Sequence, residues 1–128
     1  MRYVWILLVL IAAAINLAPV TGAFSPERMS ALYGVNLDAP NLEILMRHRA
    51  VLFGIVGGLL VAAVFRPALR TLAYIVGFAS MVSFLVVAWG VSGYSASIEH
   101  VMLMDAIGIA ALAGAGVVDA RGLRGDRA

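Results

Sequence analysis

Two histidines, two arginines and several carboxylates occur in a few short stretches of the chain and could share one binding site. Histidine exchanges protons near neutral pH, arginine binds anionic groups, and carboxylates accept hydrogen bonds. Side chains of these types in one pocket would bind the polar head of a ligand. The candidate ligand-binding residues are Asn16, Glu43, Arg47, His48, Arg49, Trp89, Glu99, His100 and Asp105.

Asp105 is the candidate that lies deepest within an apolar run. It follows His100 by five residues, which places it about 8 Å deeper along a helix that rises 1.5 Å per residue. A carboxylate in the middle of a membrane-spanning helix costs roughly 2.5–3.5 kcal/mol, so Asp105 should face the protein interior and pair with a cation. Arg47 and Arg49 are both suitable partners, and the choice stays open. Glu43 and Arg47 are also spaced for an i, i+4 pair on an exposed helix end.

The composition indicates what kind of fold must bring these residues together. Of the 128 residues, 63% are hydrophobic and 12% are charged, whereas an average soluble domain is roughly 45–50% apolar and about 25% charged. The chain has no Cys, which excludes disulfides, iron–sulfur clusters and Cys-ligated zinc. Its nine cationic side chains are all Arg and lie at the ends of apolar runs. That distribution is typical of membrane flanks and not of a nucleic-acid-binding face.

Four apolar runs are long enough to cross a membrane. A hydrocarbon core of about 30 Å needs about 20 apolar residues, and we predict spans at residues 3–20, 42–65, 68–91 and 98–118. The spans form one domain, 1–128, which is an all-α integral membrane four-helix bundle in antiparallel up-down-up-down order. We expect the first run to remain as a helix and not to be removed as a signal peptide.

The extracytoplasmic loop 21–41 has the signals of a short interfacial helix between the first two spans. Ser25 is a suitable N-cap, Pro26 suits the first helical position, and Gly34 ends the helix. Asn41 is the expected cap of the second span. The face of the short helix toward the bilayer surface would carry Met29, Leu32 and Tyr33.

The arginines also predict the orientation in the membrane. With four antiparallel spans, the side that holds both termini carries six Arg and the other side carries three. Loops rich in Arg remain in the cytoplasm, so both termini should be cytoplasmic. We therefore expect a multi-pass protein of a bacterial inner (plasma) membrane, with the candidate ligand-binding residues at its extracytoplasmic end.

Small residues predict how the spans pack. Lipid tails are as apolar as leucine, so helices in a membrane associate where small side chains permit close approach. The second span has a stripe of small residues at every fourth position, Ala50, Gly54, Gly58 and Ala62, and the fourth span has Ala106, Ala110 and Gly114. We expect these stripes to pack within one bundle. A homodimer contact through Gly54 and Gly58 is the alternative.

Two stretches of the chain resemble a group of short bacterial four-span membrane proteins. They are NLAPVTGAFSPERMSALYGV (16–35) and NLEILMRHRAVLFGIVGG (41–58). Members of that group often carry a phosphopantetheine adenylyltransferase label. Enzymes of that name use an HxGH motif, and neither His48 nor His100 is followed by Gly and His at that spacing, so the residues do not support nucleotidyltransferase activity. The pattern of spans is also similar to DoxX-like four-helix membrane proteins, some of which accompany quinone-linked oxidoreductases.

We infer from these residues a non-enzymatic binding or accessory protein that holds a lipid or quinone-like molecule, without a metal or a resident cofactor. One alternative is a b-type haem protein with His48 and His100 as axial ligands. Another is an intramembrane enzyme that acts on an apolar substrate by proton transfer, with either histidine as the acid–base group. A structural subunit of a larger membrane complex is a further alternative.

Overall fold

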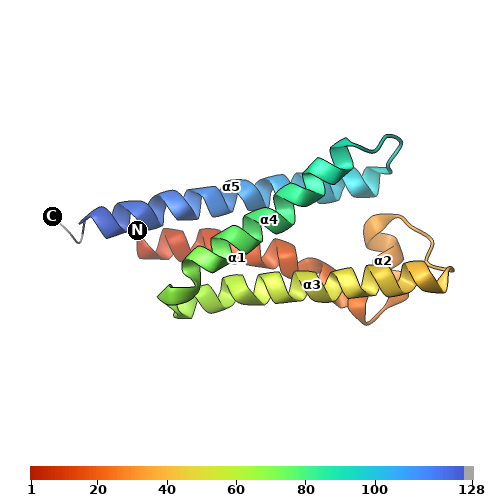
Figure 1. Cartoon of the computed structure of the whole chain (residues 1–128), viewed down its shortest axis with the longest axis horizontal. Coiled ribbons are helices and arrows are strands. Elements are labelled where there is room, and N and C mark those ends of the chain that lie inside the picture. Colours follow the sequence, from red (N-terminus) through yellow and green to blue (C-terminus); the bar gives the residue numbers. More distant parts are fainter. Residues whose placement is uncertain (126–128) are drawn as a thin grey trace.

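The structure, a computed structural model, describes residues 1–125, and within that range it is an antiparallel helical bundle without strands (Figure 1). Four long helices form the bundle: α1 (Arg2–Leu17), α3 (Pro40–Phe65), α4 (Arg70–Trp89) and α5 (Ala96–Gly125). Three short segments complete the fold: the 3-10 segment η1 (Ala18–Ala23), the helix α2 (Pro26–Tyr33) and the 3-10 segment η2 (Pro67–Leu69).

The four long helices confirm the predicted all-α bundle. Each is long and apolar enough to cross a membrane, and the candidate spans are Arg2–Ala23, Pro40–Phe65, Pro67–Trp89 and Ala96–Gly122. The second span begins two residues before its predicted start, because Pro40 is its first residue and Ala39, not Asn41, is its N-cap. Proline suits that position because its fixed φ is helical and it has no N–H to leave unpaired. The chain is therefore a multi-pass membrane protein.

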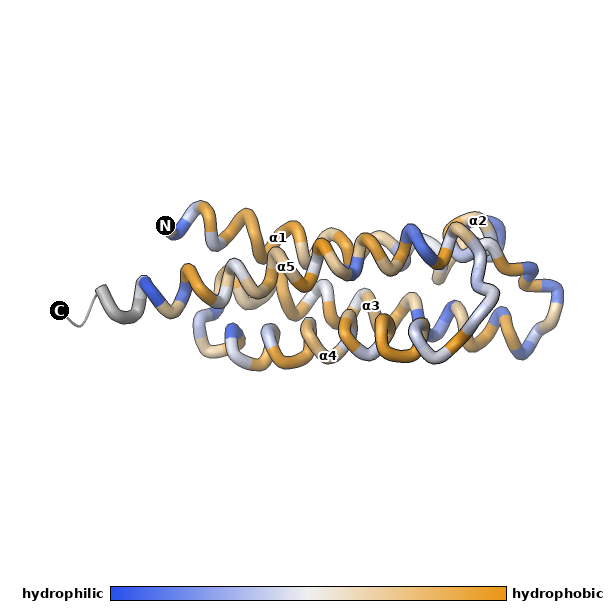
Figure 2. Tube along the Cα trace, turned by 90° about the horizontal axis from the view of Figure 1, so that it is seen from above, coloured by the Kyte–Doolittle hydropathy of each residue, from blue (hydrophilic) through white to orange (hydrophobic). Residues whose placement is uncertain are grey.

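The helices are arranged so that the start of α1 and the end of α5 lie at one end of the bundle (Figure 1). α1 packs against α3 and α5, and α4 packs against the same two helices from the other side. Figure 2 shows hydrophobic residues along most of the helix lengths and hydrophilic residues mainly toward the two ends. That distribution is the one expected for helices whose middle portions lie in hydrocarbon.

The short helix α2 has the predicted ends but a different environment. The Ser25 hydroxyl accepts a hydrogen bond from the Arg28 N–H at the start, and Gly34 has a left-handed φ of 63° at the end. Met29 and Tyr33 do not face the bilayer surface, because they are 0% and 1% exposed and pack into the end of the bundle. Gly22 leaves the necessary space: a Cβ there would lie 2.7 Å from the Cε of Met29.

The predicted stripe of small residues on α3 is only partly the packing face. Ala50 is buried, but the next buried small residue is Gly57, seven positions on, while Gly58 has open space beside it. A Cβ on Gly57 would lie 2.5 Å from the Cγ of Leu17 in α1. Four residues advance a helix by about 40° more than one full turn. A strict four-residue stripe therefore winds around α3, away from α1.

The predicted packing face of α5 was correct only at Gly114, where a Cβ would lie 3.3 Å from Cδ1 of Leu8 in α1. Ala106 and Ala110 are exposed. The inward face is instead formed by Asp105, Gly108, Leu112 and Ala115. Because Gly108 has no side chain, Met81 of α4 comes close to α5: a Cβ on that glycine would lie 2.5 Å from the Met81 sulfur.

Candidate functional site

A cavity of about 340 Å³ lies at the end of the bundle where α2 packs. The end of α1 and the start of η1 form one wall, and α2, α3 and α5 form the others. Three of the predicted site residues line it, namely Asn16, His100 and Asp105. Tyr33 and Phe53 line it as well and were missed in the sequence. The remaining lining residues are apolar: Ala14, Ile15, Ala18, Pro19, Leu32, Val101 and Met104.

Two buried oxygens in this cavity have no hydrogen-bond partner. Asp105 is 6% exposed and Tyr33 is 1% exposed, and neither Oδ2 of Asp105 nor the Tyr33 hydroxyl is hydrogen-bonded within residues 1–125. Burial raises the pKa of the Tyr33 hydroxyl; nearby Arg49 opposes this effect and Asp105 adds to it. The phenol is therefore neutral and able to donate a hydrogen bond. An unsatisfied buried polar group costs about 1–3 kcal/mol, so both oxygens favour a partner in the cavity.

Asn16 and His100 differ in how they contribute to the cavity. Asn16 is 3% exposed, and its Nδ2 donates a 2.9 Å hydrogen bond to the Ala12 carbonyl oxygen one turn earlier in α1. His100 is exposed, in the first turns of α5. The cavity thus has one amide held by its own helix and one imidazole open to solvent or headgroups.

The expected ion pair between Asp105 and an arginine does not form in the described part of the chain. The guanidinium carbon of Arg49 lies over three aromatic rings instead, 5.0 Å from the centre of Tyr33, 5.0 Å from Phe53 and 4.6 Å from Phe84. Such cation–π contacts are favourable, and more so when the cation is removed from water. Arg49 therefore supports the aromatic residues of the cavity wall without lining the cavity itself.

Arg47 is held at the surface and makes no contact with the cavity. Its Nη1 lies 3.0 Å from Oε1 of Glu43, the predicted i, i+4 pair, and both side chains are partly exposed. Its Nε donates a 2.8 Å hydrogen bond to the Ala23 carbonyl oxygen. Arg47 thus connects α3 to the end of η1, where the chain turns toward α2. His48, next to Arg47, is exposed and lines no cavity with His100.

Trp89 and Glu99 belong to a separate hollow at the connection between α4 and α5. This hollow measures about 500 Å³ and also includes Ser92 and Tyr94. Trp89 is 89% exposed. Of the nine candidate residues, the structure therefore brings three together at the cavity beside α2, and the others lie at the surface or behind an aromatic wall.

The arrangement offers no obvious metal site. Within the described residues, no three His, Asp or Glu side chains come together as metal ligands. For the haem alternative, the structure brings only one of the two histidines, His100, to the cavity. The chemistry present there is hydrogen bonding by a carboxylate, a phenol, an amide and an imidazole in apolar surroundings.

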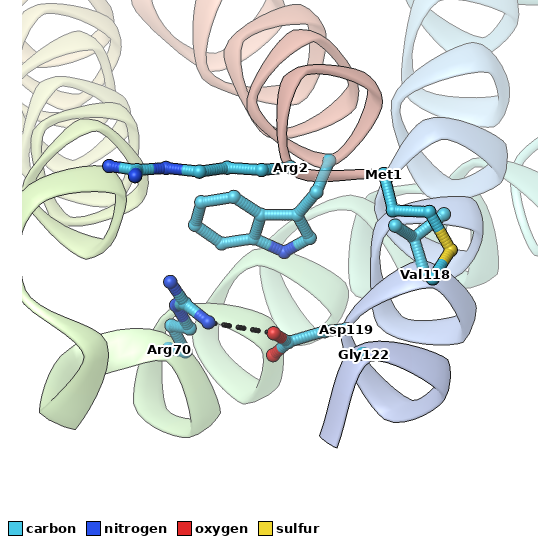
Figure 3. A pocket seen from close by; sticks show the side chains of 7 residues that line it. Met1, Arg2, Arg70, Val118, Asp119 and Gly122 are labelled. Atoms are coloured by element: carbon cyan, nitrogen blue, oxygen red, sulfur yellow. Dashed lines mark hydrogen bonds and ion pairs between the residues drawn. The ribbon is translucent and has the colours of Figure 1, made fainter. Parts of the chain in front are cut away.

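A second polar cluster, which the sequence analysis missed, lies at the opposite end of the bundle (Figure 3). Nη1 of Arg70 lies 2.7 Å from Oδ1 of Asp119, and the Arg70 guanidinium carbon lies 4.1 Å from the centre of the Trp5 ring. The Trp5 Nε1–H donates a 2.7 Å hydrogen bond to the Tyr74 hydroxyl. One signal was available: Asp119 follows Asp105 by 14 residues, nearly four helical turns, so both acids lie on one face of α5.

Comparisons with known protein families, with curated proteins and with solved structures find no match for this chain. The fold and the cavity define the class to which it belongs, a multi-pass α-helical membrane protein whose bundle encloses an apolar cavity with a few polar groups. What it does must be argued from those groups.

Proposed function

We propose that the protein binds an apolar molecule with a small hydrogen-bonding head, a lipid or a quinone-like compound, in the cavity beside α2. The observation that carries the proposal is a pair of buried oxygens, Oδ2 of Asp105 and the hydroxyl of Tyr33, that have no hydrogen-bond partner in the described part of the chain. Both residues line the same cavity. A ligand that hydrogen-bonds to both oxygens would remove the free-energy cost of leaving two buried polar atoms without partners.

The chemistry of the lining residues indicates what the head must provide. An ionised carboxylate only accepts hydrogen bonds, so Asp105 requires a donor such as a ligand hydroxyl. The Tyr33 phenol can donate to a ligand carbonyl or ether oxygen. A head with a hydroxyl near a second oxygen satisfies both residues, and a hydroquinone or a lipid alcohol has this pattern. The cavity volume of about 340 Å³ is near the lower end of the usual range of roughly 300–1,000 Å³, so it suits the head and the first part of a tail.

The cavity is lined in part by α2, which lies at the end of the bundle opposite to the start of α1 (Figure 1). Because six Arg are on the side of the termini and three on the other, we place the termini in the cytoplasm of a bacterium. The ligand would then enter from the outer leaflet of the inner membrane. A role as an accessory subunit, which passes such a molecule to a partner, is compatible with this placement.

The test is mass spectrometry of the small molecules that co-purify with the protein in mild detergent. We expect a lipid or quinone in stoichiometric amount with the unmodified protein. Asp105→Asn replaces one acceptor oxygen by a donor, and Tyr33→Phe removes the hydroxyl. Each should reduce retention of the molecule by roughly tenfold, since a hydrogen bond to a charged or buried group contributes about 1.5 kcal/mol.

The matched control is Glu99→Gln, because Glu99 is also a carboxylate near the start of α5 but does not line the cavity. This variant should retain the ligand as the unmodified protein does. Unchanged ligand content in both Asp105→Asn and Tyr33→Phe would exclude the proposed site. Protein that purifies without any bound molecule would favour a purely structural role.

A further inference from the structure

The end of the bundle that holds the termini contains a second cavity, of about 240 Å³. Three helices contribute to it: α1 provides Arg2 and Trp5, α4 provides Arg70, and α5 provides Val118 and Asp119. Figure 3 shows the labelled side chains and the ion pair that crosses from α4 to α5. This cavity shares no lining residue with the one beside α2.

The charges around this cavity do not balance. Asp119 accepts from Nη1 of Arg70 at 2.7 Å and so neutralises one guanidinium. Arg2, which is exposed, makes no ion pair within residues 1–125. The Nε of Arg70 is buried and has no hydrogen-bond partner among those residues. Among the described residues, the guanidinium of Arg2 and the Nε–H of Arg70 are therefore left without a partner at the cavity.

The position of the cavity indicates where an anion would come from. Arg2 and Arg70 lie in the first turns of candidate spans, and Asp119 lies near the end of another. These positions are at the membrane–water interface, where lipid phosphates lie next to the hydrocarbon. The cavity also has apolar walls from Trp5 and Val118, which suit the glycerol and upper acyl portion of a lipid better than they suit a fully hydrated ion.

We propose that this cavity binds a phosphate group, and specifically the phosphodiester of an anionic membrane lipid. Arg2 provides the unpaired charge, and Arg70, held in place by Asp119 and by the Trp5 ring, provides the free N–H. Guanidinium groups bind phosphate oxygens through charge-assisted hydrogen bonds. Basic pockets between membrane-spanning helices bind lipid headgroups in this way.

The experiment measures lipid binding to the full chain in detergent by native mass spectrometry. The probes are dioctanoyl phosphatidylglycerol, which is anionic, and dioctanoyl phosphatidylcholine, which has no net charge. We expect phosphatidylglycerol to bind more tightly, and Arg2→Gln to weaken its binding by roughly tenfold, as the loss of one charge-assisted hydrogen bond predicts. Arg2 is the residue to change because Arg70→Gln would also leave Asp119 without its partner.

The matched control is Arg66→Gln, which removes an exposed arginine from the same end of the bundle without touching the cavity. It should bind phosphatidylglycerol as the unmodified protein does. If Arg2→Gln bound phosphatidylglycerol as tightly as the unmodified protein does, the proposed site would be wrong. The same conclusion would follow if Arg2→Gln and Arg66→Gln lost equal affinity for this lipid. If millimolar inorganic phosphate displaced the lipid, and this effect required Arg2, the lipid would not be the ligand. The site would then be assigned to free phosphate.

Discussion

Asp105 and Asp119 are two buried or partly buried acids on one face of α5, and their surroundings differ. Asp119 has Arg70 at 2.7 Å, and the Tyr74 hydroxyl donates to its other oxygen at 3.5 Å. Within residues 1–125, Asp105 has no such partner, and its Oδ2 is unsatisfied. A carboxylate that stabilises a fold is normally paired, whereas an unpaired one at this depth is unfavourable unless a ligand uses it. The two acids should therefore respond differently to the same substitution.

Asp119→Asn should lower the free energy of unfolding by roughly 1–3 kcal/mol, because the partly buried Arg70 loses its counter-charge. Asp105→Asn should leave the stability of the ligand-free protein unchanged or raise it, because no ion pair is lost and a buried charge is removed. Thermal unfolding in detergent, followed by circular dichroism, measures both. Similar losses of stability in Asp119→Asn and Asp105→Asn would mean that Asp105 has a structural role.

At the scale of single elements, the contact between α1 and α3 depends on the rotation of each helix. Gly57 is buried under Leu17, and a Cβ there would also lie 3.1 Å from the Ala13 carbonyl oxygen. A Cβ on Gly58, one position on, would meet no atom of another described segment within 4 Å. Two adjacent glycines in similar sequence surroundings thus have opposite packing, which gives a direct test of the helix register.

Gly57→Ala should destabilise the bundle by about 1–3 kcal/mol, because its methyl group forces α1 and α3 apart or displaces Leu17. Gly58→Ala should be neutral, or stabilising by up to about 1 kcal/mol, because alanine favours the helix more than glycine does. Unfolding of the two variants by titration with sodium dodecyl sulfate compares them. The reverse order of stability would contradict the observed packing of α3 on α1.

At the scale of the whole molecule, the two cavities proposed as binding sites lie near opposite ends of an antiparallel bundle. The two cavities differ in charge: the one beside α2 has an unpaired carboxylate, and the one near the termini has an excess of arginine. In a membrane, these ends would face opposite leaflets. The distribution of Arg over the loops then decides which leaflet each cavity faces.

The absence of Cys from the chain makes this orientation directly measurable. Ser92→Cys, in the exposed connection between α4 and α5, should react with a membrane-impermeant maleimide in intact cells. Arg66→Cys, in the exposed connection between α3 and α4, should react only after the cells are lysed. If Arg66→Cys reacted in intact cells and Ser92→Cys only after lysis, the orientation would be the reverse of the one proposed. Labelling of both positions from one side would contradict an antiparallel arrangement of the spans.

The number and order of the helices could be read from the sequence because these properties are local. An apolar run of about 20 residues specifies a span, and Ser25, Pro26 and Gly34 specify the ends of α2 through contacts within a few residues. The i, i+4 pair of Glu43 and Arg47 is local in the same sense. Three of the nine predicted site residues line the cavity because the end of α1, which carries Asn16, meets the first three turns of α5, which carry His100 and Asp105.

Which residues come together at the site depends on the tertiary structure. Arg49 stacks on Phe53, one helical turn further along α3, but also on Tyr33 of α2 and on Phe84 of α4. Arg70 pairs with an acid 49 positions away. Except for the i, i+4 contact of Arg49 with Phe53, these contacts do not follow from spacing along the chain. Tyr33 became a cavity residue because α2 folds into the bundle. Helices that are apolar on every side carry little information about their rotation, since lipid and protein interior are equally apolar. The faces that meet are therefore chosen by the fit of small residues and by hydrogen bonds between helices, which exist only once the helices are assembled.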